Sequence, residues 1–375
     1  MFAVSLTELA RVFLLLGTTA FGGPAAHIAM MHDQVVRRRR WIGEQEFADL
    51  IAATNLIPGP NSTEMAVHVG RRVAGWRGLL VAGISFILPS ALIVSAFAVL
   101  YAKYGQAPDA RALLAGVAPV IIAIIVQASW SLARGSLKRP ALWLVAIIAA
   151  TLALAGVNEL VILGGSAVVV MLAASGRRVT IWATALATAG ASAQATAAGV
   201  AAATPITLGG LSLFFLKVGS ILFGSGYVLI AFLRADLVDR WHWLTDQQLV
   251  DAVAIGQFTP GPLSTTATFI GYLLGGWPGA VLCTVAIFLP GFVLVALTQP
   301  LIPRLRNSRI TAALLDGVVA ASLGLMAAVA VELARVNLTG PVPVAIAIVS
   351  VVVLVRWRIN SAWLVLAGAA VGWFL

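Results

Sequence analysis

The chain has 375 residues, of which 61% are hydrophobic and only 10% are charged. A composition this apolar excludes an ordinary soluble domain of this size and predicts an integral membrane protein with many helices. Lys and Arg total 24 against 14 Asp and Glu, which gives a net charge of +10. This excess lies mainly in short loops between apolar segments, where it indicates topology rather than nucleic-acid binding. The single cysteine, Cys283, excludes an internal disulfide and any cysteine-based metal cluster.

The first half begins with an apolar segment at about residues 6–31, which Gly22-Gly23-Pro24 interrupts. We expect it to form one broken helix that crosses the membrane, followed by a basic loop at residues 37–40. Residues 44–56 and 61–69 predict two short helices, each below the roughly 20 residues needed to cross the hydrocarbon core. They read together as a re-entrant hairpin. Four longer apolar segments follow, at about residues 79–101, 113–132, 141–155 and 160–174.

Pro58-Gly59-Pro60 separates the two short helices and occurs again as Pro260-Gly261-Pro262. Proline lacks an amide hydrogen and restricts the residue before it, so each motif ends one helix and lets the next begin directly after it. The first turn of a helix has unpaired N–H groups and a partial positive charge, and it can hold an anion. Two such turns that face each other would form an anion site. The alternative is a pair of proline-kinked helices without a ligand.

The second half repeats the first. Phe21-Gly22, Trp41 and Pro58 each recur 202 positions later, and Gly75-Trp76 recurs 201 positions later at Gly276-Trp277. We therefore predict a first membrane repeat at residues 1–180, a connector at 181–205 and a second repeat at 206–375. The connector is rich in Ala, Thr and Gly, and its structure stays open.

Topology follows from the arginines. If the Pro-Gly-Pro hairpins do not cross, each half has five crossings and the halves lie inverted. The basic loop at residues 37–40 and the arginines at 71–77, 134–139 and 177–178 then share the inner face. The predicted fold is an all-α membrane protein with about ten transmembrane helices, two re-entrant Pro-Gly-Pro hairpins and an inverted internal repeat. Both termini are expected on the periplasmic side. Inverted repeats with broken helices are a transporter design.

These motifs resemble the chromate transporter (CHR) family in its long, two-domain form. The resemblance rests on residues 21–24, 55–60 and 223–224, on Gln257 to Pro262, and on Trp41 with the acidic helix after it. It covers nearly the whole chain. Pro24 departs from the repeat, because its partner is Gly226, and Ser225 stands where the first half has Gly23. The resemblance implies export of chromate across the bacterial inner membrane, which gives chromate resistance, with sulfate as a close structural analogue.

The candidate substrate-binding residues are glycines at the helix breaks, the two proline motifs with their flanking polar residues, and one intramembrane lysine. They are Gly22, Gly23, Asn55, Pro58, Gly59, Pro60, Asn61, Ser62, Thr63, Lys217, Gly224, Ser225, Gln257, Pro260, Gly261, Pro262, Ser264 and Thr265. Lys217 would attract a dianion or extend its amine to the surface. Glu64, His27 and His68 are candidates for proton coupling, and ordinary packing is the alternative for each.

Rival interpretations remain open at this point. A sulfate or other oxyanion carrier would need the same charge and hydrogen-bond donors. A membrane-embedded enzyme is less favoured, because no nucleophile–base or metal-ligand spacing occurs, and a sensor would need an output domain. We expect no enzyme activity, no cofactor and no metal. The expected partners are chromate or a sulfate-like oxyanion and the lipid bilayer, without nucleic acid. A homodimer is open, although both repeats are already present in one chain.

Overall fold

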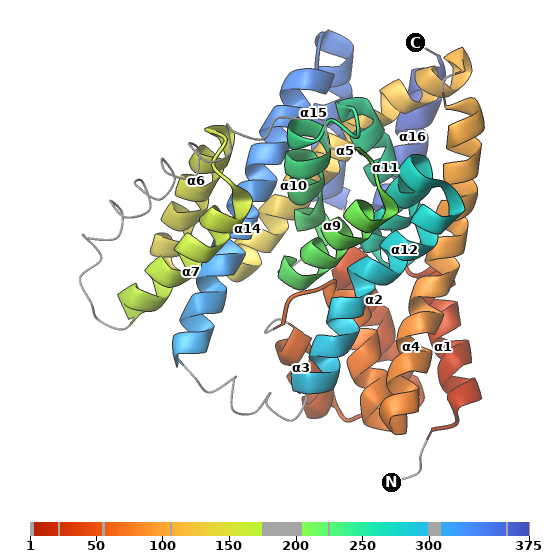
Figure 1. Cartoon of the computed structure of the whole chain (residues 1–375), viewed down its shortest axis with the longest axis vertical. Helices are drawn as coiled ribbons and strands as arrows, with labels where there is room; N and C mark the ends of the chain where they lie inside the picture. Colours follow the sequence, from red (N-terminus) through yellow and green to blue (C-terminus); the bar gives the residue numbers. More distant parts are fainter. Residues whose placement is uncertain are drawn as a thin grey trace.

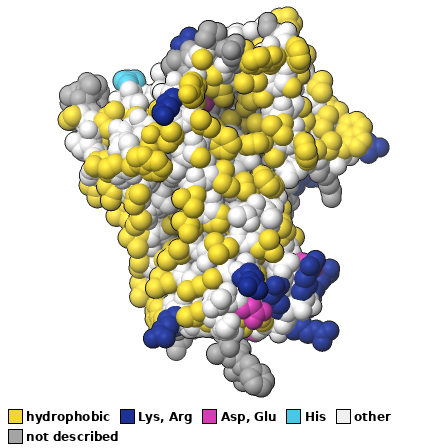
Figure 2. All heavy atoms as spheres, turned by 90° about the vertical axis from the view of Figure 1, so that its right-hand side faces the viewer, with side chains coloured by type: hydrophobic (Ala, Val, Ile, Leu, Met, Phe, Trp, Pro, Cys, Tyr) yellow, Lys and Arg dark blue, Asp and Glu magenta, His cyan; other side chains and the backbone are white. Residues whose placement is uncertain are grey.

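A computed structural model describes residues 4–21, 23–54, 57–105, 107–174, 205–223, 226–298, 309–357 and 359–374. These residues are almost entirely helical and contain no β-strand. On the face that Figure 2 shows, hydrophobic side chains cover the middle of the molecule, and Lys and Arg gather mainly toward its lower end. Four helices in the described ranges are long and apolar enough to cross a membrane, and several shorter apolar helices accompany them. The predicted class, an all-α membrane protein, is therefore confirmed.

The helices of the first half are α1 (Leu6–Thr19), α2 (Gly23–His32), the π-helix η1 (Asp33–Arg38), α3 (Glu44–Thr54), α4 (Asn61–Tyr104), α5 (Pro108–Ser136), α6 (Pro140–Leu154) and α7 (Glu159–Ala174). Those of the second half are α9 (Leu208–Ile221), η3 (Gly226–Val228), α10 (Leu229–Phe232), the π-helix η4 (Leu233–Arg240), α11 (Asp246–Phe258), η5 (Leu263–Thr265), α12 (Thr266–Thr298), α14 (Arg309–Asn337), α15 (Pro341–Trp357) and α16 (Ser361–Trp373).

The first apolar segment reverses direction instead of crossing as one broken helix. Nε of Arg39, which follows η1, lies 3.6 Å from Oε1 of Glu8 in the first turn of α1. The second half folds back in the same way, since Gly210 near the start of α9 lies against the Trp243 ring. The prediction that residues 6–31 cross the membrane once is therefore wrong. An apolar run of about 26 residues satisfies either a single crossing or two shorter arms of a hairpin.

Both long helices α4 and α12 contain a second reversal. Gly75 has φ +64° and ψ −151°, and Gly276 has φ +62° and ψ −156°. Gly70 and Gly78 would be about 12 Å apart in a straight helix, yet a Cβ on Gly70 would lie 2.2 Å from the carbonyl oxygen of Gly78. The two arms of α4 therefore lie against each other, and glycine allows both the backbone turn and the close packing.

The two halves exchange their last helices. α5 packs against α15 and α16 of the second half, and α14 packs against α6 and α7 of the first half. Close glycine contacts fix both interfaces. A Cβ on Gly116 would lie 2.1 Å from the Gly368 carbonyl oxygen, and one on Gly317 would lie 2.5 Å from that of Ser166. Neither half therefore has a complete interior without the other.

The ends of the chain lie at opposite ends of the molecule. Figure 1 places the start of α1 near its lower end and the end of α16 near its upper end. This arrangement disagrees with the expectation that both termini share one face. The cause is again the fold-back of the first apolar segment. Counting residues 6–31 as one crossing places the start of the chain on the wrong side. The predicted connector at residues 181–205 lies outside the described residues, apart from Pro205.

Candidate functional site

The two Pro-Gly-Pro loops lie against the two helix breaks, each against the break in the opposite half. The Gly59 N–H donates to the Leu222 carbonyl over 2.6 Å, and the Gly261 N–H donates to the Ala20 carbonyl over 2.9 Å. Gly59 and Gly261 are repeat-related by 202 positions, and so are Ala20 and Leu222. This reciprocal pair of hydrogen bonds joins the halves at the point where four helical segments end.

The helices restart after the proline motifs largely as the sequence predicts. α4 begins at Asn61, and its first turn contains Ser62 and Thr63. In the second half a single 3₁₀ turn with Ser264 and Thr265 precedes α12. All four hydroxyl side chains are buried. They lie at the helix starts, but they do not line the cavity described next.

A small closed cavity lies between the first break and the second proline loop. Its volume is about 10 Å³, which is room for about one water molecule. It is lined by Ala20, Gly23, Pro24, His27, Tyr227, Gly256, Gln257, Thr259, Gly261 and Leu263. The lining thus comes from both halves of the chain. Of the residues predicted to bind substrate, Gly23, Gln257 and Gly261 meet here, together with the coupling candidate His27.

Two polar atoms at this cavity, Nδ1 of His27 and Nε2 of Gln257, are buried and have no hydrogen-bond partner among the described residues. Nε2 of His27 lies 3.1 Å from the Ala20 carbonyl oxygen, so this nitrogen carries the hydrogen. The Tyr227 hydroxyl donates to Oε1 of Gln257 over 3.4 Å, which leaves the amide NH₂ free to donate. Because buried polar atoms are normally hydrogen-bonded, this pair indicates a polar guest. The Gln257 amide donates in any state, whereas Nδ1 of His27 donates only when the ring is protonated.

The repeat-related region around Glu64 has different chemistry. At the second proline loop, the hydroxyl of Ser90 in α4 lies 2.9 Å from the Thr265 hydroxyl, and Thr265 also donates to the Pro262 carbonyl over 2.8 Å. The position related to Ser90 is Gly291, so the Thr63 hydroxyl has no such partner, and it is buried without a hydrogen bond to any residue that the structure describes. The two proline loops are therefore not chemically equivalent.

Glu64 occupies the space beside Gly59 and Gly291, which have no side chains. A Cβ on Gly59 would lie 2.0 Å from Oε1 of Glu64, and one on Gly291 would lie 3.6 Å from the same atom. The side chain is 1% exposed, and neither carboxyl oxygen has a hydrogen-bond partner within the described ranges. His68, one turn further along α4, is also buried, and neither ring nitrogen has a partner among the residues that the structure describes. A charged carboxylate would be costly in such a place.

Lys217 lies away from the small cavity, in an acidic cluster. Its amine pairs with the buried Asp236 carboxylate, and it also lies 3.8 Å from Oε1 of Glu159. Neither partner lines the small cavity. The lysine therefore helps to neutralise a buried acidic cluster at the contact of α7, α9 and η4. Gly22, Asn55, Gly224 and Ser225 lie outside the described residues.

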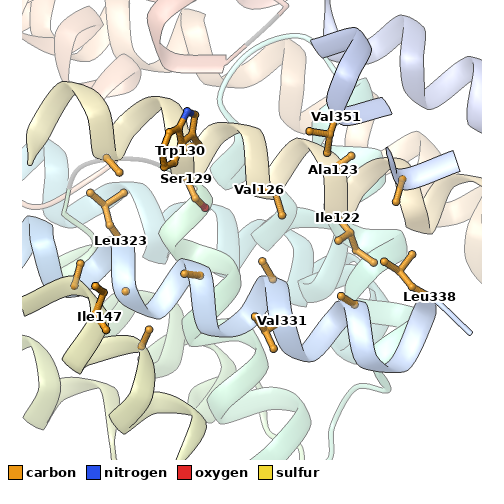
Figure 3. A pocket seen from close by; sticks show the side chains of 18 of the residues that line it. Ile122, Ala123, Val126, Ser129, Trp130, Ile147, Leu323, Val331, Leu338 and Val351 are labelled. Atoms are coloured by element: carbon orange, nitrogen blue, oxygen red, sulfur yellow. The ribbon is translucent and has the colours of Figure 1, made fainter. Parts of the chain in front are cut away.

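Tyr227 is the cavity residue that the sequence analysis missed. It stands in an apolar segment, and position 25, its repeat-related partner, is alanine. A comparison of the two halves for positions where they differ in polarity would have found it. Another cavity, of about 660 Å³, lies between α5, α6, α14 and α15 and has an almost wholly apolar lining without a charged side chain (Figure 3). It cannot hold a dianion. In the described ranges no three His, Cys, Asp or Glu side chains gather as a metal site.

Comparison with known proteins identifies the family. The sequence profile of the chromate transporter family matches residues 7–172 and 209–373. The chain belongs to the chromate transporter family. A chromate transport protein of Pseudomonas aeruginosa is 34% identical over 391 residues, covering 99% of this chain and 93% of its own length. A chromate transport protein of Cupriavidus metallidurans is 30% identical over 380 residues, covering 98% of this chain and 92% of its own length.

Shorter proteins also match. The uncharacterized transporter YwrA of Bacillus subtilis is 30% identical over 126 residues, which is 34% of this chain but 71% of YwrA. YwrA therefore aligns with about one third of the present chain. No solved structure matches.

Proposed function

We propose that this chain exports chromate from the cytoplasm across the bacterial inner membrane, and so confers chromate resistance. The observation that carries the proposal is the cavity between the two halves of a chromate transporter family member. Its unpartnered Gln257 amide is a neutral donor of the kind that a tetrahedral dianion needs. A neutral donor suits transport, because it holds the anion without the strong binding that would prevent release.

The topology we propose is an inverted repeat with re-entrant hairpins. Leu79 clusters with Val295 while Gly83 lies against Phe292, so the second arms of α4 and α12 run antiparallel. α3 has 11 residues and is about 16 Å long, roughly half of the hydrocarbon core. Arg72 pairs with Glu46 near the start of α3, on the face of the basic loop. The positive-inside rule places this face and the start of α1 in the cytoplasm.

The driving force favours export. One charge crossing 100 mV gains about 2.3 kcal/mol, so a dianion leaving a cell at roughly 150 mV, inside negative, gains on the order of 7 kcal/mol. That free energy supports a gradient of about 10⁵-fold. The membrane potential alone is therefore sufficient to drive export, whereas import of the dianion would have to work against the same potential.

The transport cycle we propose is alternating access between the two halves. A cavity of about 10 Å³ holds one water molecule, so a four-oxygen anion enters only after the halves separate. The reciprocal hydrogen bonds of Gly59 and Gly261 lie where that separation starts. A rocking motion would break one bond and keep the other, and so open the cavity to one side at a time.

Proton coupling is a second component of the proposal, and Glu64 is its best-supported site. Its carboxyl group is buried beside Gly59, at the loop that joins the halves, and has no hydrogen-bond partner in the described part of the chain. A proton bound here would remove the cost of a buried carboxylate, and loss of that proton would favour rearrangement of the loop. His27 and His68 remain secondary candidates.

The deciding experiment is uptake of radiolabelled chromate into everted membrane vesicles under an imposed potential, with sulfate as competitor. We expect uptake that follows the potential and weakens when Gln257 is replaced by leucine. Absence of flux above empty vesicles, with the protein shown to be inserted, would remove chromate as the substrate. A stronger response to labelled sulfate than to chromate would favour a sulfate carrier.

A further inference from the structure

A second, larger polar cavity lies beside the small one; it is called the outer cavity below, and the small cavity is called the inner cavity. Its volume is about 710 Å³, and it is bounded by α2, α5 and the ends of α15 and α16 that face each other. Its polar lining consists of Gln127, Ser131, Arg134, Tyr227, Asn360 and Ser361. Arg134 lies in the last turn of α5. By the positive-inside rule we assign this end of α5, and with it the opening of the cavity, to the cytoplasmic side, the source of the anion.

Arg134 gives this cavity its charge. The guanidinium lies 5.9 Å from the centre of the Trp130 ring, which also lines the cavity. No carboxylate in the described ranges pairs with Arg134, and the lining contains no acidic residue. An arginine with free donors beside hydroxyl and amide groups is the usual chemistry for a tetrahedral oxyanion.

Tyr227 separates the two cavities, because it lines both. Its hydroxyl donates to Gln257 on the inner side. A Cβ on Gly23 would lie 3.5 Å from the same hydroxyl, so the tyrosine tip rests against a glycine with φ +79°. The side chain is 9% exposed. Of the residues that line these two cavities, Tyr227 is the one that both share, which places it between the outer cavity and the Gln257 amide.

We propose that the outer cavity is a second oxyanion-binding subsite, in which Arg134, Gln127 and Ser131 hold the anion before Tyr227 admits it to the inner cavity. The proposal rests on the proposed transport function and adds an entry site to it. The ligand class is a tetrahedral dianion. A phosphate group of an anionic lipid carries the same chemistry, so the test separates the two sources.

Cysteine labelling tests binding without any need for flux. Cys283 is the single cysteine and is fully buried, so the parent chain serves as the unreactive blank. Ser131 lines the polar cavity, whereas Ser129, two residues earlier on α5, lines the apolar cavity (Figure 3). Ser131→Cys and Ser129→Cys are therefore a matched pair on opposite faces of one helix. The probe is a cationic methanethiosulfonate reagent, and sulfate is the protecting anion because chromate oxidises thiols.

In phosphatidylcholine vesicles we expect Ser131→Cys to react from the cytoplasmic face, and sulfate to slow the reaction several-fold. Ser129→Cys should react far more slowly. Adding Arg134→Gln to Ser131→Cys should abolish protection, and Arg134→Lys should restore part of it. Protection by sulfate that survives Arg134→Gln, or equal labelling of the two cysteines, would overturn the subsite. Protection that needs anionic lipid and not sulfate would assign the cavity to a lipid headgroup and also overturn it.

Flux measurements separate this inference from the transport function. Arg134→Gln should raise the KM for chromate about tenfold with kcat nearly unchanged, as expected for loss of one charge-assisted contact of about 1.4 kcal/mol. An unchanged KM in a chain that transports chromate would remove the entry site and leave the proposed function intact. Absence of flux in the parent chain would remove the proposed function, while the labelling result would still decide whether the cavity binds a dianion.

Discussion

At the scale of single residues, the differences between the two halves carry most of the functional information. Ser90 and Thr265 form a hydrogen bond, whereas their counterparts Gly291 and Thr63 do not. Glu64 fills the resulting space, and Thr266 stands at its repeat-related position. The repeat therefore supplies a built-in comparison, in which a shared residue serves the fold and a differing polar residue is a candidate for function.

Gln257→Leu should lower kcat/KM for chromate by about 10- to 100-fold. Leucine has nearly the shape of glutamine but lacks the amide that we assign to the anion, and a hydrogen bond to a charged group contributes about 1.5–3 kcal/mol. Initial uptake rates in everted vesicles measure the effect. Gln45→Leu is the control, since Gln45 is exposed on α3 away from the cavity. Equal rates for both variants would mean that the anion does not contact Gln257.

Glu64→Gln should remove the effect of the pH gradient and keep the response to voltage. Glutamine keeps the size of the side chain but cannot release a proton. If export exchanges chromate for protons, an acidic vesicle lumen increases uptake by the parent chain, and this increment disappears in the variant. Glu8→Gln is the control at the surface, where Glu8 faces Arg39. An increment that persists in Glu64→Gln would transfer the coupling role to His27 or His68.

At the scale of elements, the glycines of the α4 hairpin differ in what they tolerate. Gly75 has open space around a Cβ but a backbone conformation that essentially only glycine adopts, so Gly75→Ala should cost about 1–3 kcal/mol. Gly70→Ala places a Cβ 2.2 Å from a backbone oxygen and should be far more damaging. Thermal unfolding of the purified variants in detergent ranks them. A larger loss for Gly75→Ala would mean that the two arms are not closely packed.

The sequence predicts element starts better than it predicts element directions. Proline chemistry correctly places the start of α4 at Asn61, because the reason is local. The fold-back of residues 6–38 is not local, since an apolar run does not reveal whether its ends meet. The lining of the small cavity is harder still to predict from the sequence, because Tyr227 reaches Gln257 only through tertiary packing. The proline motif was therefore predictable, and the tyrosine beside it was not.

At the scale of the whole molecule, the exchanged helices make the halves depend on each other. Cutting the chain after residue 180 and expressing both pieces together should restore a complex with chromate flux. Either piece alone should fail to accumulate, because α5 would lack α15 and α16, and α14 would lack α6 and α7. Co-purification through a tag on one piece, together with flux, measures this. A stable, active single piece would contradict the exchanged packing.

The different chemistry of the two proline loops has an evolutionary consequence. In a homodimer of half-length chains, every substitution appears on both sides of the symmetry axis. Such a dimer must carry either two copies of the Glu64–Gly291 pair or two copies of the Thr266–Ser90 pair. A fused gene is free of this constraint, because each copy mutates alone. Joining the halves therefore allows one loop to keep the Ser90–Thr265 hydrogen bond while the other carries an ionisable group, Glu64.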